Sequence, residues 1–537
     1  MQYLNFLKKN WVVLVIFSVL VLIIYGQSLS GDFVYDDRGI IGNAEVLSNI
    51  GHVEDIFMHP YWEAENGLYR PMTLLSYSFN FIIFGQSPFS FHLVNLILYI
   101  FICFFIYLLI KKLFKQELFA FLSAILFLVL PIHTEVVANI TGRSELLALF
   151  FGLLAMLEFS KEKINFYWLG LWSFMAVGGK ETGVAIVPII FLMLYHKENK
   201  INLEIIKKYF KEISAVIIST GFYFFLRFFS LGTDNFLNIK TSLVENPLLF
   251  TDTFSRFATS LKILWMYFHK TFWPVNLCND YSFNQIPIIH NWLNFGTILG
   301  LLIIALSMFL IIKYFKKNPT LSLGATIFLF AFLPVSNLFF PIGTVAGERL
   351  FFFPTLGIVI LTAFLIYKIY ISIKKENTKT IYLISIAILF LVYGILSLNR
   401  QSVWTTEEKL FLSGAKCAPN SVLSRSNEGA MYLLKGDLNK AEEILLVSMN
   451  MKPIYSKGIN NLGLVYAKKG DYKKAKEMYL LALKQEYPYS GAIENLISLY
   501  LNTGKIENAK HWLMIMYPYD EATIDASIKN YLEQNRK

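Results

Sequence analysis

The sequence predicts an all-α, polytopic helical membrane protein that ends in a soluble α-solenoid. Of its 537 residues, 55% are hydrophobic and only 16% are charged, which is too apolar for a soluble protein of this size. Apolar stretches of spanning length recur up to about residue 400, and short lysine-rich loops separate them. Beyond that point the composition becomes that of a soluble protein. We therefore expect two domains, residues 1–400 and residues 401–537.

Eleven stretches before residue 400 qualify as spans, because a helix needs about 20 apolar residues to cross the hydrocarbon layer. The segment 254–273 is also apolar, but Arg256, Lys262, His269 and Lys270 interrupt it. We expect this segment to be an amphipathic or re-entrant helix on the outer side. The spans on either side of Lys180 are short and interrupted by glycine, so a hairpin that does not fully cross is the alternative for them. The predicted spans are 11–29, 91–114, 118–133, 144–160, 164–178, 182–196, 210–229, 292–314, 321–341, 349–371 and 379–399.

Lysine and arginine are sorted between the two sides of these spans. Lysines fill every second loop, which predicts a cytoplasmic N-terminus and places everything after residue 400 outside. The net charge of +10 therefore indicates contact with anionic lipid headgroups rather than with nucleic acid. Every arginine before residue 401 falls on the outer side, where guanidinium groups suit a phosphate-bearing substrate. These arginines are Arg38, Arg70, Arg143, Arg227, Arg256, Arg349 and Arg400.

Residues 401–537 repeat with a period of 34 residues. The repeat places tyrosine late in one helix, glycine at the turn and alanine where the paired helices meet. This pattern resembles the tetratricopeptide repeat. We expect about three repeats, a leading half-repeat at 404–418 and a capping helix at 520–536. The concave face of such a stack either binds a peptide or only stiffens the outer region. The recurring positions are Tyr432, Tyr466 and Tyr500; Gly436, Gly470 and Gly504; and Ala441, Ala475 and Ala509.

The first outer loop, residues 30–90, carries two adjacent carboxylates just beyond the first span, Asp36 and Asp37. Neighbouring acids repel, and in a partly desolvated site this repulsion raises one pKa, which suits a general base, or it recruits a cation. A solvated turn is the alternative interpretation. The same loop supplies Arg70, which directly precedes Pro71.

Three further outer clusters place charged residues directly beside apolar spans, where charge is costly unless it is paired or faces water. A single His-x-Glu motif is a weak zinc signal, so hydrogen bonding is favoured over metal ligation for it. The other two clusters each pair opposite charges, and they are either functional or internal ion pairs between helices. Their placement on one face of the membrane favours a common site. The clusters contain His133, Glu135 and Arg143; Lys180 and Glu181; and Glu348 and Arg349.

The order of these motifs resembles the transmembrane and tetratricopeptide repeat protein O-mannosyltransferases, over nearly the whole chain. The resemblance implies the GT-C glycosyltransferase fold and transfer of mannose from a polyprenyl-phosphate carrier to protein hydroxyls. The brief repeat array indicates a compact bacterial relative. The motifs are Tyr35-Asp36-Asp37, Tyr69-Arg70-Pro71, Phe91 to Asn95, His133-Thr134-Glu135 through Gly142-Arg143, Lys180-Glu181, Asp280-Tyr281-Ser282 and Glu348-Arg349.

The resemblance also implies roles for these residues. Asp36 would take the proton of the acceptor hydroxyl, and Asp37 would tune or orient it. One direct displacement would invert the anomeric centre. No cofactor is firmly expected, and a divalent cation such as Mg²⁺ or Mn²⁺, held by Asp36 and Asp37, is left open. The leaving lipid phosphate would be met by Arg143 and Arg349, then by Arg70, Lys180 and His133, with Glu135, Glu181 and Glu348 orienting these groups.

The expected function is therefore an inverting glycosyltransferase that moves mannose or another hexose from a polyprenyl-phosphate carrier to a hydroxyl, expected to belong to protein Ser or Thr. The site would lie on the outer face of a bacterial cytoplasmic membrane, with the repeats in the periplasm or outside the cell. The expected partners are the lipid-linked sugar, a protein or peptide acceptor recruited through the repeats, and membrane lipids. A lipid or cell-surface polysaccharide glycosyltransferase of the same fold is one alternative. A membrane-anchored tetratricopeptide adaptor without enzymatic activity is the other.

Overall fold

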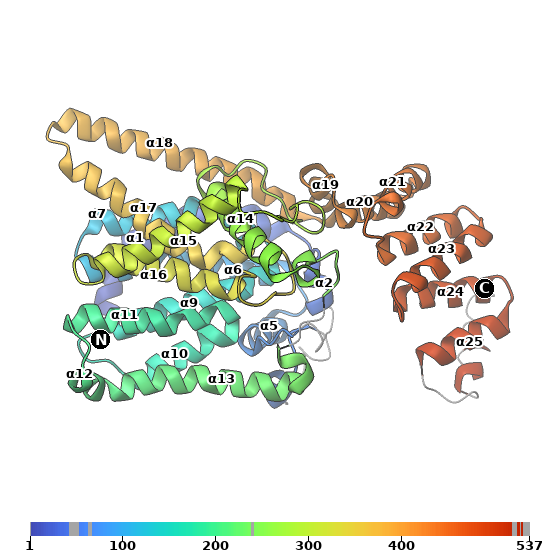
Figure 1. Cartoon of the computed structure of the whole chain (residues 1–537), viewed down its shortest axis with the longest axis horizontal. Coiled ribbons are helices and arrows are strands. Elements are labelled where there is room, and N and C mark those ends of the chain that lie inside the picture. Colours follow the sequence, from blue (N-terminus) through green and yellow to red (C-terminus); the bar gives the residue numbers. More distant parts are fainter. Residues whose placement is uncertain are drawn as a thin grey trace. The chain divides into compact units, whose positions relative to one another are not determined.

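The computed structural model describes residues 2–41, 53–62, 67–237, 241–517, 523–526 and 528–529, and helices are the regular secondary structure of these residues (Figure 1). The chain forms two compact units. The first contains Met1–Ser242, Leu248–Asn279 and Ile288–Leu410. The second contains Leu243–Pro247, Asp280–Pro287 and Phe411–Lys537. The second unit thus combines the repeat region with two short segments taken from the middle of the chain.

A helix lies within each of the eleven stretches predicted as spans, but fewer of these helices are long enough to cross a membrane. Length and apolarity among the described residues qualify seven, or up to eight if the pair Glu117–Val129 and Pro131–Ala138, bent by 55°, counts as one span. The count of eleven is corrected accordingly, because three predicted spans form helices of only 14, 13 and 14 residues. The three short helices are α10 (Phe166–Gly179), α11 (Ile186–Glu198) and α16 (Pro319–Phe332).

The longer helices of the first unit lie roughly alongside one another in the bundle (Figure 1). Short 3-10 turns interrupt several of them, and these turns carry much of the site described below. The helices are α1 Gln2–Tyr25, α2 Asp36–Ile41, α4 Val53–Met58, α5 Pro71–Phe84, α6 Pro88–Phe114, α7 Glu117–Val129, α8 Thr134–Ala138, α9 Arg143–Phe159, α12 Leu203–Lys208, α13 Phe210–Leu237, α14 Thr253–Phe272, α15 Phe295–Tyr314, α17 Phe352–Ser372 and α18 Glu376–Gln401. The turns are η1 Gly26–Ser30, η4 Pro131–His133, η5 Ile140–Gly142, η6 Glu181–Ala185, η8 Leu333–Val335, η9 Glu348–Phe351 and η10 Ser402–Thr405.

Helix α14 covers the segment that was excluded from the spans, and it is absent from the candidate spans of the described residues. It packs closely on α15, where a Cβ at Gly300 would lie 1.9 Å from the carbonyl oxygen of Leu261. The hydroxyl of Thr297 also donates to Ala258 O at 2.9 Å. The predicted helix at 254–273 is therefore present, and its place on the outer side of the membrane stays a prediction.

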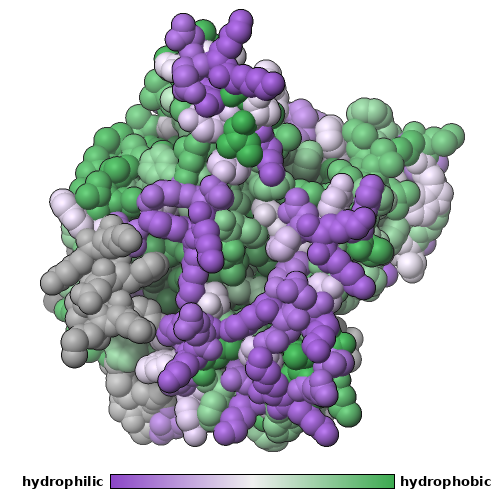
Figure 2. Space-filling model, turned by 90° about the vertical axis from the view of Figure 1, so that its left-hand side faces the viewer, coloured by the Kyte–Doolittle hydropathy of each residue, from purple (hydrophilic) through white to green (hydrophobic). Residues whose placement is uncertain are grey.

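The two ends of the helical bundle in the first unit differ in chemistry. The turns after α6, α9, α11, α15 and α17 carry lysines, and Figure 2 shows this lysine end as hydrophilic patches among apolar side chains. Helix α9 connects the two ends, since Glu158 pairs with Lys161 at the lysine end and Glu145 pairs with Lys180 at the other. We call that other end, which contains α2, η5, η6 and η9, the arginine end.

The second unit contains the predicted repeats as antiparallel helix pairs. The turn glycines Gly436, Gly470 and Gly504 have φ of +81°, +82° and +71°, a conformation that favours glycine. The repeat alanines are fully buried where the helices of a pair meet. The predicted capping helix at 520–536 falls largely outside the described residues. The helices are α19 Glu407–Cys417, α20 Val422–Leu434, α21 Leu438–Asn450, α22 Ser456–Lys468, α23 Tyr472–Gln485, α24 Ser490–Asn502 and α25 Ile506–Met516.

Asp280 belongs to the second unit, where it anchors the segment Asp280–Pro287 to the first repeat. Its Oδ2 accepts hydrogen bonds from the hydroxyls of Ser421, at 2.5 Å, and Ser424, at 2.6 Å. Ser421 is the N-cap residue of α20, so the segment contacts the start of that helix. The motif Asp280-Tyr281-Ser282 thus has an evident packing role in the repeat unit.

Candidate active site

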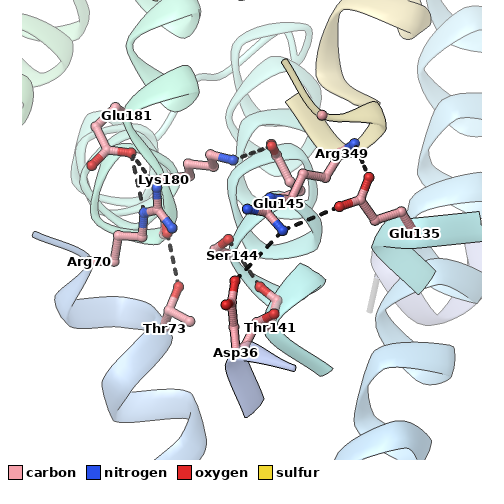
Figure 3. Close-up of polar contacts among 12 residues, drawn as sticks. Asp36, Arg70, Thr73, Glu135, Thr141, Ser144, Glu145, Lys180, Glu181 and Arg349 are labelled. Carbon is pink, nitrogen blue, oxygen red and sulfur yellow. Dashed lines mark hydrogen bonds and ion pairs between the residues drawn. The ribbon is translucent and has the colours of Figure 1, made fainter. Parts of the chain in front are cut away.

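The centre of the candidate site is an arginine shared by two carboxylates at the arginine end. The Nη1 atom of Arg349 lies 3.2 Å from Glu135 Oε1 and 3.7 Å from Asp36 Oδ2, and its backbone N–H donates to Glu135 Oε2 at 2.9 Å. Figure 3 shows Arg349 between the two acids. Glu135 is buried, whereas the side chains of Asp36 and Arg349 are 33% and 29% exposed. An incoming ligand therefore meets one carboxylate and one guanidinium side by side.

Local backbone conformation directs Asp36 toward Arg349. Tyr35, directly before it, has φ of +54°, which is uncommon for a residue other than glycine. Asp36 and Asp37 then occupy the first turn of α2, where the helix dipole favours negative charge. The two adjacent acids therefore begin α2, and this helix fixes the direction of the partly exposed Asp36 side chain.

Asp37 is fully buried and has a different environment from Asp36. Its Oδ2 accepts from Val34 N at 3.1 Å, and its Oδ1 accepts from Thr141 N at 3.0 Å, so it ties α2 to η5. Burial raises the pKa of Asp37 to about 7, although these two N–H donors oppose the rise. The repulsion between adjacent acids that the sequence suggested contributes less than burial. Asp37 is placed to orient Asp36 rather than to meet an acceptor.

Lys180 forms a buried ion pair with Glu145 of α9 beside this centre (Figure 3). The two side chains are 4% and 0% exposed. Glycine allows the close packing of this turn, since a Cβ at Gly183 would lie 2.3 Å from Ala176 O. Thr73 of α5 donates to Gly179 O at 2.9 Å and fixes the backbone just before Lys180. The run Gly178 to Gly183 is therefore a packed break between two short helices.

Glu181 joins two arginines from distant parts of the chain. Its Oε2 accepts from Arg70 Nη2 at 3.2 Å, and its Oε1 lies 3.6 Å from Arg227 Nη1. Burial would raise the pKa of Glu181, but the two guanidinium groups outweigh it and lower that pKa below its ordinary value. Arg70 lies at the N-terminus of α5, directly before Pro71, which begins the helix. The cluster thus has more positive than negative charge close to Glu181.

Arg143 lies in the same region but is enclosed. It is fully buried, and its three nitrogens donate to Asn95, Ser76, Asn80 and the carbonyl oxygen of Phe91. Its guanidinium also stacks over the Tyr77 and Phe91 rings. These contacts use its donors within the protein and favour a role in holding α5, α6 and α9 together. Phosphate binding by Arg143 remains a prediction that this geometry does not favour.

His133 and Glu348 are also turned into the protein. The Nδ1 atom of His133 lies 2.9 Å from Phe127 O, and its Nε2 lies 2.7 Å from Thr355 Oγ1. Glu348 accepts from Cys278 N at 2.6 Å. Both side chains are buried, so their contacts favour positioning of η4 and η9 over direct contact with a substrate.

Two residues were missing from the predicted site. Glu145 is the buried partner of Lys180, and Arg227 is the second cation on Glu181. Arg227 interrupts an otherwise apolar span, which is itself a signal of function because charge at membrane depth is costly. Glu145 follows Arg143 by two residues and could have been included on the same ground. The sequence gives no spacing that links either residue to its partner.

A divalent cation does not fit the acids expected to hold it. Within the described ranges, no group of three or more His, Cys, Asp or Glu side chains is arranged to bind a metal ion. Asp37 already accepts two backbone N–H bonds, and Asp36 faces the cationic side chain of Arg349. The mechanism proposed below therefore includes no metal-dependent step, and metal use stays a prediction for experiment.

Comparison with known sequences supports the family suggested by the motifs. Three family profiles match the chain: Dolichyl-phosphate-mannose-protein mannosyltransferase at residues 66–224, Protein O-mannosyl-transferase TMTC, DUF1736 at 239–308, and Tetratricopeptide repeat at 456–486. The first profile includes Arg70, Glu135, Lys180 and Glu181 of the candidate site.

Similar curated proteins span the membrane and repeat regions together. Protein O-mannosyl-transferase F38B6.6 of Caenorhabditis elegans is 28% identical over 84% of this chain and 64% of its own length. Protein O-mannosyl-transferase TMTC1 of Homo sapiens is 27% identical over 81% and 54%, and tmtc2 of Xenopus laevis is 26% identical over 75% and 58%. The chain thus spans between about half and two thirds of the length of these relatives. With the motif order and the repeats, the matches support a resemblance of this chain to the TMTC-like protein O-mannosyltransferases.

Proposed function

We propose that this chain is an inverting glycosyltransferase that moves mannose or another hexose from a polyprenyl-phosphate carrier to a hydroxyl acceptor at the arginine end. The single observation that carries the proposal is the shared opening of Asp36 and Arg349, whose side chains lie 3.7 Å apart and are each about one third exposed. A general base and an anion-binding group are what a displacement at a sugar phosphate requires. The printed names of the relatives support the reaction class.

In the proposed reaction, the acceptor hydroxyl attacks the anomeric carbon from the face opposite the phosphate. A carbon–oxygen bond to the acceptor forms while the carbon–oxygen bond to the lipid phosphate breaks. The hydroxyl proton passes to Asp36, and the electron pair of the broken bond stays on the phosphate. Arg349 stabilises the charge that develops there, with Arg70 and Lys180 as nearby cations. No covalent enzyme intermediate is needed.

The buried acids hold these cations in place in this proposal. Glu135 fixes both the backbone and the side chain of Arg349, and Glu145 fixes Lys180. Glu181 separates Arg70 and Arg227, which would otherwise repel each other. An arrangement held by buried pairs needs little reorganisation when the phosphate arrives, which is the property that makes electrostatic catalysis effective.

We further infer that the acceptor is protein Ser or Thr and that the repeats recruit it. Helix pairs in a stack of this kind leave an extended face for a peptide. The sorting of lysine and arginine supports a cytoplasmic N-terminus and an outward site. The brief repeat array supports a bacterial cytoplasmic membrane as the location.

The test is release of polyprenyl phosphate by the detergent-purified full chain, measured over a panel of polyprenyl-phosphate sugars with Ser- and Thr-containing acceptor peptides. Asp36→Asn keeps the shape but removes the base, so we expect turnover to fall by about 100-fold or more. Asp55→Asn changes an exposed carboxylate of the same outer loop and should have no effect. Turnover of one donor that Asp36→Asn leaves intact would exclude Asp36 as the base. Absence of turnover over the whole panel would contradict the proposed activity.

A further inference from the structure

Helix α14 contacts the turn that carries Arg349, and the proposed mechanism gives this contact no role. The hydroxyl of Tyr267, in the second half of α14, accepts a hydrogen bond from the backbone N–H of Gly347 at 2.9 Å. Its ring stacks on the ring of Phe351, with the centroids 4.8 Å apart and the planes inclined by 14°. Gly347 is the N-cap of η9 and Phe351 is its last residue. One tyrosine therefore contacts both ends of the turn.

Other contacts fix the same turn. Glu348 accepts from the backbone N–H of Cys278, which lies in the segment that follows α14. The ring of Phe351 also packs edge-on against two rings of α16, those of Phe328 and Phe332, each with its centroid 6.0 Å away. The turn is thus held by α16 as well as by α14 and the segment that follows it.

Helix α14 is itself firmly placed in the first unit. It crosses α15 with almost no space between the two backbones, because glycine stands at the crossing point, where Gly300 faces the carbonyl oxygen of Leu261. Tyr267 follows Leu261 by less than two helical turns, and its side chain is only 1% exposed. A side chain that is locked by packing on a regular element places its neighbours precisely. Tyr267 therefore suits the positioning of another group and leaves almost no surface for a ligand.

Arg349 depends on such positioning because its side chain is open on one side. It is 29% exposed, and its Nη1 atom faces Asp36 and Glu135 (Figure 3). A guanidinium group stabilises a developing charge effectively only if it is in place before the charge forms. The two carboxylates fix the end of the side chain, and the hydrogen bond to Tyr267 fixes the backbone on the N-terminal side of Arg349.

We propose that Tyr267 is a positioning residue, which holds the η9 turn so that Arg349 meets the phosphate that leaves the sugar. The proposal rests on the proposed function for the role of Arg349, and it gives α14 a task in the same reaction. Tyr267 acts through Arg349 and does not touch the substrate. Its hydroxyl is the decisive group, because the hydroxyl holds the backbone of the turn whereas the ring has only a packing contact.

A matched pair of variants in the full chain tests this role. Tyr267→Phe and Tyr393→Phe each remove one tyrosine hydroxyl that bonds to the backbone, but Tyr393 donates to Phe272 O at the end of α14, away from the turn. Both are assayed with the polyprenyl-phosphate sugar that the unmodified chain turns over. We expect Tyr267→Phe to lower kcat by about tenfold and to change KM by less than about twofold, because Arg349 matters most as charge develops on the phosphate. Tyr393→Phe should keep both values.

A double variant tests whether Tyr267 acts through Arg349. If it does, adding Tyr267→Phe to Arg349→Lys should lower kcat by less than about twofold beyond Arg349→Lys alone. Three results would overturn the proposal while the proposed glycosyl transfer stands. They are an unchanged kcat in Tyr267→Phe, an equal loss in Tyr393→Phe, and a further loss of about tenfold in the double variant.

Hydrogen exchange separates the positioning of the turn from the activity. Backbone amide exchange of a peptide that covers residues 347–351 is measured by mass spectrometry in the unmodified chain and in both tyrosine variants. We expect exchange in this peptide to be about tenfold faster in Tyr267→Phe and unchanged in Tyr393→Phe, because the turn opens more easily without the hydroxyl. Such a difference without any turnover of the unmodified chain would support the positioning while the proposed activity fails. Unchanged exchange in Tyr267→Phe would overturn the proposal whether or not turnover is seen.

Discussion

The arginine end and the lysine end of the first unit contain the same types of charged pair in opposite settings. Glu145 of α9 and Lys180, in the break between α10 and η6, are 35 residues apart in sequence and almost completely buried. Glu376 and Lys379 are three residues apart on one helix, and their side chains are 81% and 25% exposed. Burial makes a charge expensive and its partner indispensable, whereas water screens an exposed pair. The difference indicates that the Glu145–Lys180 pair depends on a fixed charge arrangement, whereas the Glu376–Lys379 pair contributes little beyond charge balance.

The largest effect should come from breaking the buried pair on one side only. Lys180→Met leaves the Glu145 carboxylate without its cation, and we expect a loss of about 3–5 kcal/mol of stability. The double variant Lys180→Met/Glu145→Met removes both charges and should recover most of that loss. Thermal denaturation of the purified chain measures both. If the double variant loses as much stability as the two single variants together, the two side chains are not coupled. The contrast between the buried pair and the exposed pair would then be lost.

A smaller but more specific effect is expected at Arg349. Arg349→Lys keeps the positive charge beside Glu135, so the melting temperature should change little. A lysine lacks the planar fork that reaches Glu135 and Asp36 together. If the proposed function holds, turnover should fall by about 100-fold at unchanged fold stability. Normal turnover in Arg349→Lys would show that Arg349 acts only as a structural counter-ion, like the cations of the lysine end.

Much of this arrangement follows from sequence, and the limits have physical causes. Apolar runs and flanking lysines predict helices in all eleven stretches, because hydrophobicity is a local property. The glycine-interrupted stretches beside Lys180 already indicated a hairpin of short helices, which agrees with α10 and α11. The short α16 was not predicted, since helix ends depend on packing. The repeats are recovered well because their 34-residue period encodes both the turns and the buried alanines.

The candidate site shows the limit more sharply. The sorting of lysine and arginine between the two sides predicts that Asp36, Arg70, Glu135 and Arg349 share one end. It does not predict whether the guanidinium group of an arginine is enclosed by protein partners or open to a ligand. Arg143 is enclosed by partners that lie in two other helices, α5 and α6. Polar residues within those apolar helices, such as Asn80 and Asn95, were the available signal. Pairing across helices is a tertiary property, so it leaves no fixed spacing in the sequence.

Asp37 provides a prediction that depends on pH. Its pKa is raised to about 7 in the folded protein, whereas an ordinary aspartate titrates near pH 4. The folded state therefore binds the proton more tightly, and this contribution to stability is full below about pH 4 and is lost as the pH rises to about 7. Asp37→Asn should remove that dependence, at a cost of about 1–3 kcal/mol at pH 5 because one of the two N–H donors loses its acceptor. The melting temperatures of the unmodified chain and of Asp37→Asn, compared from pH 4 to pH 8, measure this pH dependence.

A slope with pH that persists in Asp37→Asn would assign the titration to another group. A matched variant is Asp55→Asn, which changes an exposed carboxylate in the same loop and should keep the slope of the unmodified chain. The comparison is confined to the first unit, so the repeats do not enter it.

The smallest effect is expected at the lysine end itself. Lys379→Ala removes an exposed partner of Glu376, and water and salt already screen that pair. We expect no measurable change in melting temperature or in turnover at physiological salt. Because lysine near the ends of spans acts through the summed charge of the loop, one substitution should also leave the orientation of the chain unchanged. If Lys379→Ala lost as much stability as Lys180→Met, the exposed pair would be as necessary as the buried pair. The two pairs would then differ only in the sequence separation of their partners.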